Sequence, residues 1–513
     1  MVGMEKFLNS GKEWLTQYVG SINLDSASVR YIIGTLAVVG VAVLLRTEKK
    51  KNYPPMVPYT LPLIGHTWMY KKDRKAFIRS CTEKYGPVFR VMIEGMEMVI
   101  VDKHLVVYTT GQKYLNFMEA LFDITNLSTA LEIPNQESNH EFISGFVKRN
   151  LTRRLDTYVP RVAKFVQRGF EKWLGDLNGE KTLNGFAMVR DIVVTAASSA
   201  LVGEELCCDE RLKGIFMRVV VDMSPTFMRP FPAYTKFWES FLFWYYDVPN
   251  KNIRGISAII KPEIDRRRRE REELGESWNR PCDLLQDCID ECPPDIPVEI
   301  YASKCLHAIA FLAMHTTSKF GAMVVYAMAK YTEFTDELVQ EQRELYAVDP
   351  AITVESLKSM VKLDSYIREC LRKSNSTLGL AHKVLKDTKL PNGMSVDKGA
   401  HIYINYISTH WTNENDEYDE EFRPFRFTGK SKTAVRPATD YLIFGFGKHT
   451  CPGRFFAINE IKYITAILLR EYEFRLEQPD EPELFSGGRR PPMSNIVFKK
   501  RMNFVGSEYS NSL

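Results

Sequence analysis

The chain has 513 residues, of which 45% are hydrophobic and 26% charged, with a formal net charge of +4. This composition is typical of a globular protein, and it excludes wholesale disorder and a protein with many membrane spans. The length allows one large core that buries a cofactor, and the near balance of charge indicates no nucleic-acid partner.

An apolar segment near the N-terminus is a candidate membrane helix. Residues 30–46 consist of an uncharged run of fifteen residues between Arg30 and Arg46. Such a helix spans about 22 Å against roughly 30 Å of hydrocarbon, so the arginines would snorkel or the bilayer would thin. A signal-peptide core is the alternative, but basic residues rather than a small-residue cleavage site follow the run. We therefore expect an uncleaved transmembrane helix, preceded by a lumenal or interfacial N-terminus over residues 1–29.

The flanking charges predict the topology of this anchor. Four basic residues follow the run within six positions, which places the C-terminal bulk in the cytosol. Nine cysteines without C-x-x-C steps agree with a reducing compartment. Residues 47–66 are basic and proline-rich and are predicted to be a stiff hinge, because proline suits neither a helix interior nor a central strand. Residues 67–513 are the predicted globular domain.

The globular domain is predicted to be mainly α-helical with small β-sheets. Helical spacing of apolar residues predicts helices at 160–175, 191–203, 254–274, 299–330, 335–346, 354–373 and 454–471. Strand-like alternation predicts strands near 87–102, 378–405 and 492–505. The charged run at 265–272 contains interleaved acids and is predicted to be a solvated helix face.

Two apolar segments are candidates for contact with a hydrophobic ligand. Residues 225–246 contain ten aromatic residues and suit either core packing or a membrane-facing entrance. The helix at 299–330 is apolar nearly all round, yet His315, Thr316 and Thr317 lie in its middle. On the residues alone, threonines bonded to carbonyls one turn earlier and a satisfied core histidine are the simpler interpretation.

Three charged residues are candidates for a buried cluster. Glu369 and Arg372 lie three apart on a predicted helix and can form a charge-assisted pair, although such pairs are usually on the surface. Arg426 lies between aromatics in FRPFRF, residues 422–427, and could add a second guanidinium to the same carboxylate.

The sequence FGFGKHTCPGR, residues 444–454, places one cysteine between glycines and a Pro-Gly step. Neither a dinucleotide fingerprint nor a P-loop fits this spacing. We expect a helix to begin at Cys451, so that unpaired amides and the helix dipole lower the thiol pKa. Gly447 and Gly453 would let the backbone approach a flat ligand. The loop favours a metal with one axial sulfur ligand, and a buried structural thiol is the alternative.

These motifs together resemble cytochrome P450, the family of haem-thiolate monooxygenases, in its membrane-anchored eukaryotic and filamentous-fungal form. The haem-binding signature of the family corresponds to Phe444, Gly447, His449, Cys451 and Gly453. Its Glu-x-x-Arg and Pro-x-Arg-Phe motifs correspond to Glu369, Arg372 and Arg426. The Trp-x-x-x-Arg helix of the family is not evident.

The resemblance implies haem b as cofactor, with Cys451 as the axial iron ligand. His449 stands where the family more often has an arginine that binds a haem propionate. Either Lys383 or His382 stands where the family commonly places a second basic propionate partner.

The resemblance also assigns residues to the oxygen side of the haem. Ala313 would leave room for dioxygen, and Thr316, followed by Thr317, would hold it and deliver protons. His315 replaces the usual Asp or Glu, as in sterol demethylases, and would change the proton relay.

The implied activity is hydroxylation of a hydrophobic small molecule, with a steroid or terpenoid as the favoured substrate. Residues 114–124 and 376–381 would line the substrate pocket. Electrons would come from NADPH through NADPH–cytochrome P450 reductase, docked near Lys448 and Arg454, with cytochrome b5 as a further partner. The protein would be a single-pass endoplasmic reticulum membrane protein with its catalytic domain in the cytosol. The alternatives are a reductase-independent isomerase or dehydratase and a non-catalytic membrane protein that binds haem.

Overall fold

The computed structural model describes residues 52–59, 64–124, 133, 139–175, 177–227, 245, 247–374, 377–413, 415, 417–478, 484–485, 493–502 and 504. The predicted N-terminus, the predicted anchor at 30–46 and most of the aromatic segment at 225–246 lie outside these residues.

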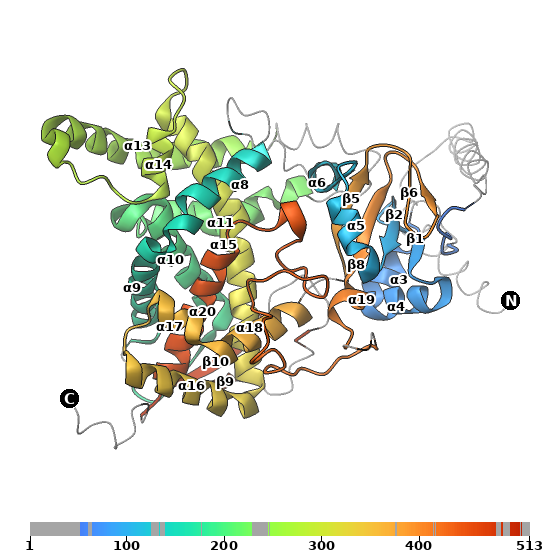
Figure 1. Cartoon of the computed structure of the whole chain (residues 1–513). Helices are drawn as coiled ribbons and strands as arrows, with labels where there is room; N and C mark the ends of the chain where they lie inside the picture. Colours follow the sequence, from blue (N-terminus) through green and yellow to red (C-terminus); the bar gives the residue numbers. More distant parts are fainter. Residues whose placement is uncertain are drawn as a thin grey trace, which may run out of the picture.

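The larger part of the described chain is a body of helices around one long central helix, α15 (Figure 1). This helix packs against α10, α11, α13, α14, α18 and α20. Its apolar sequence explains the placement, because a helix that is apolar on all sides is stable only when neighbours cover it. The helices of the body are α8 (Asn139–Asn150), α9 (Leu155–Leu174), α10 (Gly185–Leu206), α11 (Glu210–Phe227), α13 (Val248–Leu274), α14 (Leu284–Asp290), α15 (Val298–Lys330), α16 (Thr335–Val348), α17 (Val354–Ser359), α18 (Val361–Lys373) and α20 (Arg454–Glu471).

A five-stranded sheet lies beside the helical body, in the order β1-β2-β8-β5-β3 (Figure 1). Its strands are β1 (Val88–Ile93), β2 (Met96–Val101), β3 (Leu115–Asn116), β5 (Leu378–Val384) and β8 (His401–Asn405). The pair β2–β8 is parallel, and the other pairs are antiparallel. The helices at this end are α3 (Thr67–Lys72), α4 (Arg74–Tyr85), α5 (Val106–Gly111), α6 (Phe117–Ile124) and α19 (Tyr406–His410).

Alternation along the strands gives the sheet a core on both faces. On β2, Met98 and Ile100 belong to the core of the helical body, whereas Val99 and Val101 belong to a smaller core on the other face. Successive strand residues point to opposite faces, so an apolar strand of this kind must be covered on both sides.

Short elements complete the fold. A three-stranded sheet has the order β4-β10-β9, with β4 (Glu180–Asn184), β9 (Tyr472–Leu476) and β10 (Asn495–Lys500), and β6 (Thr388–Lys389) pairs with β7 (Ser395–Val396). The short 3-10 helices are η1 (Lys103–Leu105), η2 (Thr152–Arg154), η4 (Gly275–Ser277), η5 (Thr332–Phe334) and η6 (Gly447–His449).

The fold class predicted from the sequence, mainly helical with small sheets, is confirmed, with differences at several boundaries. The single helix expected at 354–373 is two helices separated by Met360, whose φ of −74° and ψ of 72° are not helical. The helix expected to begin at Cys451 begins at Arg454. Helical spacing missed α4, which Asp73 caps by accepting a hydrogen bond from the Ala76 amide at 2.9 Å.

The described part of the predicted hinge lies along the edge of the large sheet. The Val57 amide donates to Arg90 O of β1 at 2.9 Å, and the Arg90 amide donates to Pro55 O at 2.8 Å. Prolines are tolerated here because an edge segment does not need every amide as a donor.

Two described helices, α10 and α15, are long and apolar enough to cross a membrane. Most residues in the apolar stretch of each helix are buried inside the protein, so the apolar composition of α10 and α15 reflects packing in the core.

Candidate functional site

Backbone hydrogen bonds shape the loop that carries Cys451. The Cys451 amide donates to Phe444 O at 2.7 Å, and the Gly445 amide donates to Leu442 O at 3.0 Å. Gly445 has a φ of +75°, and a Cβ on it would lie 2.8 Å from His449 O. The loop therefore requires glycine at this position, and it presents the cysteine from a fixed backbone.

The surroundings of the Cys451 thiol differ from the expectation. Burial raises its pKa, while the Gly453 and Arg454 amides and the Arg454 guanidinium act in the lowering direction without overcoming burial. The prediction of a lowered thiol pKa is wrong for the polypeptide alone, because the cost of desolvating a thiolate outweighs the stabilisation from the amides at the start of α20. A bound metal cation favours the thiolate, so ligation itself would supply the missing stabilisation.

Contacts from other segments fix the residues after the cysteine. Thr152 Oγ1 donates to Pro452 O at 2.8 Å. Arg454 donates through Nη1 to Cys451 O at 2.9 Å and through Nε to Val435 O at 3.1 Å. Gly453 has a φ of −86°, and no atom lies within 4 Å of a Cβ built on it, which leaves space for a flat ligand.

A histidine and aromatic cluster borders the cysteine loop. The ring of His449 lies 5.6 Å from that of Phe117 and 6.4 Å from that of His382. His382 is 1% exposed, and its Nδ1 is 2.7 Å from Leu380 O. Its Nε2 is buried and has no hydrogen-bond partner among the described residues. Burial lowers the pKa of His382 to about 4.

Lys383, one of the two residues predicted to contact a haem propionate, forms an ion pair with a carboxylate. Its Nζ lies 2.8 Å from Asp123 Oδ2, while His382, the preceding residue, lies beside His449. Consecutive strand residues point in opposite directions, so β5 brings only one of the two to the loop. The ring of His382 therefore borders the loop and Lys383 pairs with Asp123, and both residues stay predictions as propionate partners.

The middle of α15 has one accessible face within an otherwise buried helix. Leu312, His315 and Thr316 are exposed and lie at i, i+3 and i+4, whereas Thr317 is buried. Thr316 Oγ1 donates to Leu312 O at 3.0 Å and to Ala313 O at 3.2 Å, which is the back-bonded arrangement of an apolar helix.

The surroundings of His315 disfavour its charged form. Desolvation lowers the pKa of its imidazole, and the positive charges of Lys319 and Arg190 lower it further. These surroundings favour the neutral form of the imidazole.

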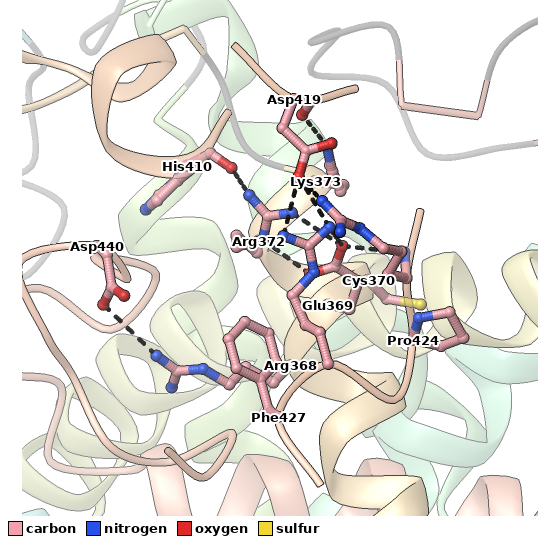
Figure 2. Close-up of polar contacts among 12 residues, drawn as sticks. Arg368, Glu369, Cys370, Arg372, Lys373, His410, Asp419, Pro424, Phe427 and Asp440 are labelled. Atoms are coloured by element: carbon pink, nitrogen blue, oxygen red, sulfur yellow. Dashed lines mark hydrogen bonds and ion pairs between the residues drawn. The ribbon is translucent and has the colours of Figure 1, made fainter. Parts of the chain in front are cut away.

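The three predicted charged residues meet in one cluster, and Figure 2 shows Glu369 and Arg372 within it. Arg372 donates to both carboxylate oxygens of Glu369 at 2.8 Å, and Arg426 Nη2 lies 3.2 Å from Glu369 Oε1. Asp419, which no sequence motif indicated, lies with its Oδ2 3.1 Å from both terminal nitrogens of Arg426. Burial opposes ionisation of Asp419, but Arg423, Arg426 and Lys373 lower its pKa to about 2. Asp419 therefore gives Arg426 a second carboxylate partner in addition to Glu369.

No local pattern distinguished Asp419 from the other acids of its polar loop. Its role depends on Arg426, seven residues away across an irregular segment, and on Lys373 of α18, whose Nζ donates to Asp419 O. His410, which lies between this cluster and the cysteine loop, was missed for the same reason.

Comparisons with known proteins agree with this geometry. A family model described as Cytochrome P450 matches residues 54–497. Cytochrome P450 monooxygenase 71 of Postia placenta is 26% identical, over 93% of this chain and 99% of the relative. Cytochrome P450 monooxygenase sirB of Leptosphaeria maculans is 25% identical, over 78% of this chain and 79% of the relative.

A solved structure shows the same fold. Retinoic acid bound cyanobacterial CYP120A1 superimposes with a TM-score of 0.66 at 19% identity, and the match covers 88% of this chain and 100% of that one. The family match extends over most of the chain and includes the cysteine loop and the charge cluster. The chain therefore belongs to the cytochrome P450 family of haem-thiolate monooxygenases.

Proposed function

We propose that this monooxygenase hydroxylates a hydrophobic small molecule of the steroid or terpenoid class, with electrons from NADPH delivered by a membrane-bound reductase. The observation that carries the proposal is the cysteine loop, in which Cys451 is held by its amide bond to Phe444 O beside the open space at Gly453. The exposed Leu312 on α15 supports an apolar substrate. The likeness to fungal monooxygenases supports the oxygenase activity, whereas the steroid or terpenoid class is our extension from the sequence resemblance.

Haem b fits the residues around the loop. Cys451 would ligate the iron, and the buried Nε2 of His382, together with His449, would receive the propionates. Because Leu380 O accepts from Nδ1, Nε2 of His382 donates only when the ring is protonated, and an adjacent carboxylate would raise its pKa. When bound, haem supplies the activation of dioxygen.

The residues of α15 would hold and move protons on the other side of the cofactor. Thr316 keeps its hydroxyl hydrogen on Leu312 O or Ala313 O, and a small rotation would redirect it toward a ligand. His315 lies one residue earlier, and its lowered pKa means that a proton taken up by the ring would be released readily to a neighbour. Ala313 leaves space on the same helix, and the apolar residues around it exclude bulk water.

The reductase would dock on the side of the protein that carries the cysteine loop. Lys448 is exposed there, whereas Arg454 is engaged with Cys451 O and Val435 O, so Lys448 is the better contact for an acidic partner. Cytochrome b5 would use the same surface. The apolar run at 30–46 would anchor the protein in the endoplasmic reticulum membrane with this surface in the cytosol.

Carbon-monoxide difference spectra of the reduced protein test the ligand. The wild-type protein should give the red-shifted Soret band of a ferrous–CO complex with an axial thiolate, and Cys451→Ser should lose that band. The assignment of Cys451 would be refuted if Cys451→Ser kept the band. It would also be refuted if the haem-supplemented wild-type protein lacked the band.

Substrate titrations and turnover separate this function from its alternatives. Steroids and terpenoids should produce a low-to-high spin shift and should be hydroxylated only with NADPH and reductase. Turnover without NADPH would instead indicate an isomerase or dehydratase. A protein with a normal thiolate spectrum but no spin shift with any lipophilic compound would be a non-catalytic haem protein.

A further inference from the structure

His410 joins the buried charge cluster to the cysteine loop through two different atoms. Its carbonyl oxygen accepts a hydrogen bond from Arg372 Nη1, as Figure 2 shows. Its ring Nε2 accepts the amide hydrogen of Leu442 at 2.9 Å. Leu442 O in turn accepts from the Gly445 amide at 3.0 Å, at the start of the loop that ends in Cys451. Hydrogen bonds, linked through the covalent structure of His410 and Leu442, therefore connect Glu369 and Arg372 to the cysteine loop.

The bond to Leu442 determines the protonation state of the ring. A backbone amide can only donate, so Nε2 must be the unprotonated nitrogen and His410 must be neutral. The residue is 0% exposed, and burial together with the Arg372 charge lowers its pKa to about 3. The hydrogen bond from Leu442 places the ring hydrogen on Nδ1. Burial and the neighbouring charge agree with a neutral ring.

The short helix α19 holds His410 in this orientation. Asn405 caps α19 by accepting from the Ile407 amide at 2.9 Å, and the carbonyl of Asn405 accepts from Thr409 Oγ1 at 2.9 Å. The ring of Tyr406 lies 4.7 Å from the ring of His410. The imidazole is therefore packed in a fixed position between the cluster and the loop, and it does not follow the loop passively.

We propose that His410 is a positioning residue for the haem thiolate: its carbonyl is fixed by Arg372, and its Nε2 holds Leu442 so that the loop presents Cys451 in the orientation needed for ligation. The inference rests on the proposed ligand role of Cys451. It implies that the Glu-x-x-Arg pair acts on the thiolate through His410 as well as through the stability of the fold.

Replacement by two amides tests the ring nitrogen directly. In His410→Gln the side-chain oxygen can occupy the position of Nε2, whereas in His410→Asn the side chain is too short to do so. We expect His410→Asn to lower the ratio of thiolate-ligated to thiol-ligated protein in the ferrous–CO spectrum by about tenfold. A change of this size is expected because the buried amide of Leu442 loses its hydrogen-bond acceptor. His410→Gln should recover most of the wild-type ratio.

His66 provides the matched control. It is also 0% exposed and accepts a backbone amide, that of Met92 in β1, through Nδ1 at 3.0 Å, but it lies at the start of α3 and not beside the cysteine loop. His66→Leu should lower the urea midpoint of unfolding without changing the thiolate ratio of the haem-loaded protein. Urea midpoints of all variants separate loss of stability from loss of positioning.

Two results would overturn the proposal. One is an equal thiolate ratio in His410→Gln and His410→Asn at equal haem content. The other is a loss of thiolate in His66→Leu as large as that in His410→Asn, which would make the effect one of general stability. If the wild-type protein lacks the thiolate band, the proposed function itself fails, and that outcome is recognisable before any His410 variant is compared.

Discussion

Arg426 Nη2 lies 3.2 Å from Glu369 Oε1, so one carboxylate contacts the guanidinium groups of both Arg372 and Arg426. Glu369 is 0% exposed, and Asp419 supplies a second carboxylate to Arg426. Buried ions in such a cluster are stable only together, because removal of one leaves the others desolvated and unpaired.

Removal of the shared carboxylate is expected to destabilise the protein strongly. Glu369→Gln should lower the free energy of unfolding by about 3 to 5 kcal/mol, because two buried guanidiniums lose their charged partner. Glu355→Gln is the control, since its 2.8 Å pair with Lys358 is on the surface and should change stability by less than about 1 kcal/mol. Urea unfolding measures both, and equal effects of the two substitutions would contradict a buried cluster.

Two glycines of the cysteine loop should respond differently to alanine. Gly445→Ala should destabilise the fold by at least about 1 to 2 kcal/mol, because its φ is +75° and its Cβ would lie 2.8 Å from His449 O. Gly453→Ala should leave the urea midpoint unchanged, since its φ is −86° and the position is open, but should weaken haem binding. Haem titration and urea unfolding together check the pair. A stable Gly445→Ala variant would show that the loop tolerates a side chain there.

The hydroxyl of Thr316 is expected to control coupling of electron use to product. Thr316→Ala should release peroxide and form less product for each NADPH consumed, because a proton donor beside the site of dioxygen is lost. Ser318→Ala is the control, since Ser318 is buried on the same helix and its Oγ donates to Met314 O at 2.6 Å. Product, peroxide and NADPH are measured together. Unchanged coupling in Thr316→Ala would refute the role of this hydroxyl.

Two of the buried histidines, His382 and His410, make stability depend on pH. Burial lowers the pKa of His382 to about 4 and that of His410 to about 3, below the ordinary value of 6.5. The unfolded chain therefore binds more protons than the native protein, and stability should fall as pH decreases below 6.5.

His410→Gln should weaken this dependence. The variant lacks one titrating group, so the slope of unfolding free energy against pH should decrease by up to about 1.4 kcal/mol per unit below the unfolded pKa. Urea unfolding of the variant and wild type over the same pH series measures the difference. Identical slopes would mean that His410 is already protonated in the native protein or stays neutral in the unfolded chain.

Local sequence determined most of the secondary structure and the candidate chemistry. Apolar spacing predicted α15 within one residue of its start and the range 454–471 of α20, although the Pro-Gly step after Cys451 suggested an earlier start for α20. The order and spacing of Glu369, Arg372, Arg426 and Cys451 indicated the family, because each motif consists of residues only a few positions apart. The same local patterns could not show the break at Met360, where the periodicity continues across two helices.

Tertiary structure decided which side chains meet and how strongly they are desolvated. Adjacent residues in the sequence, His382 and Lys383, point to the cysteine loop and to Asp123 respectively, because strand β5 alternates between its faces. Burial raised the pKa of Cys451 against the expected effect of the helix amides. Asp419 and His410 gained their roles only from partners brought together by folding. Spacing along the chain fixes local geometry, whereas charge balance and desolvation depend on every segment that packs around a site.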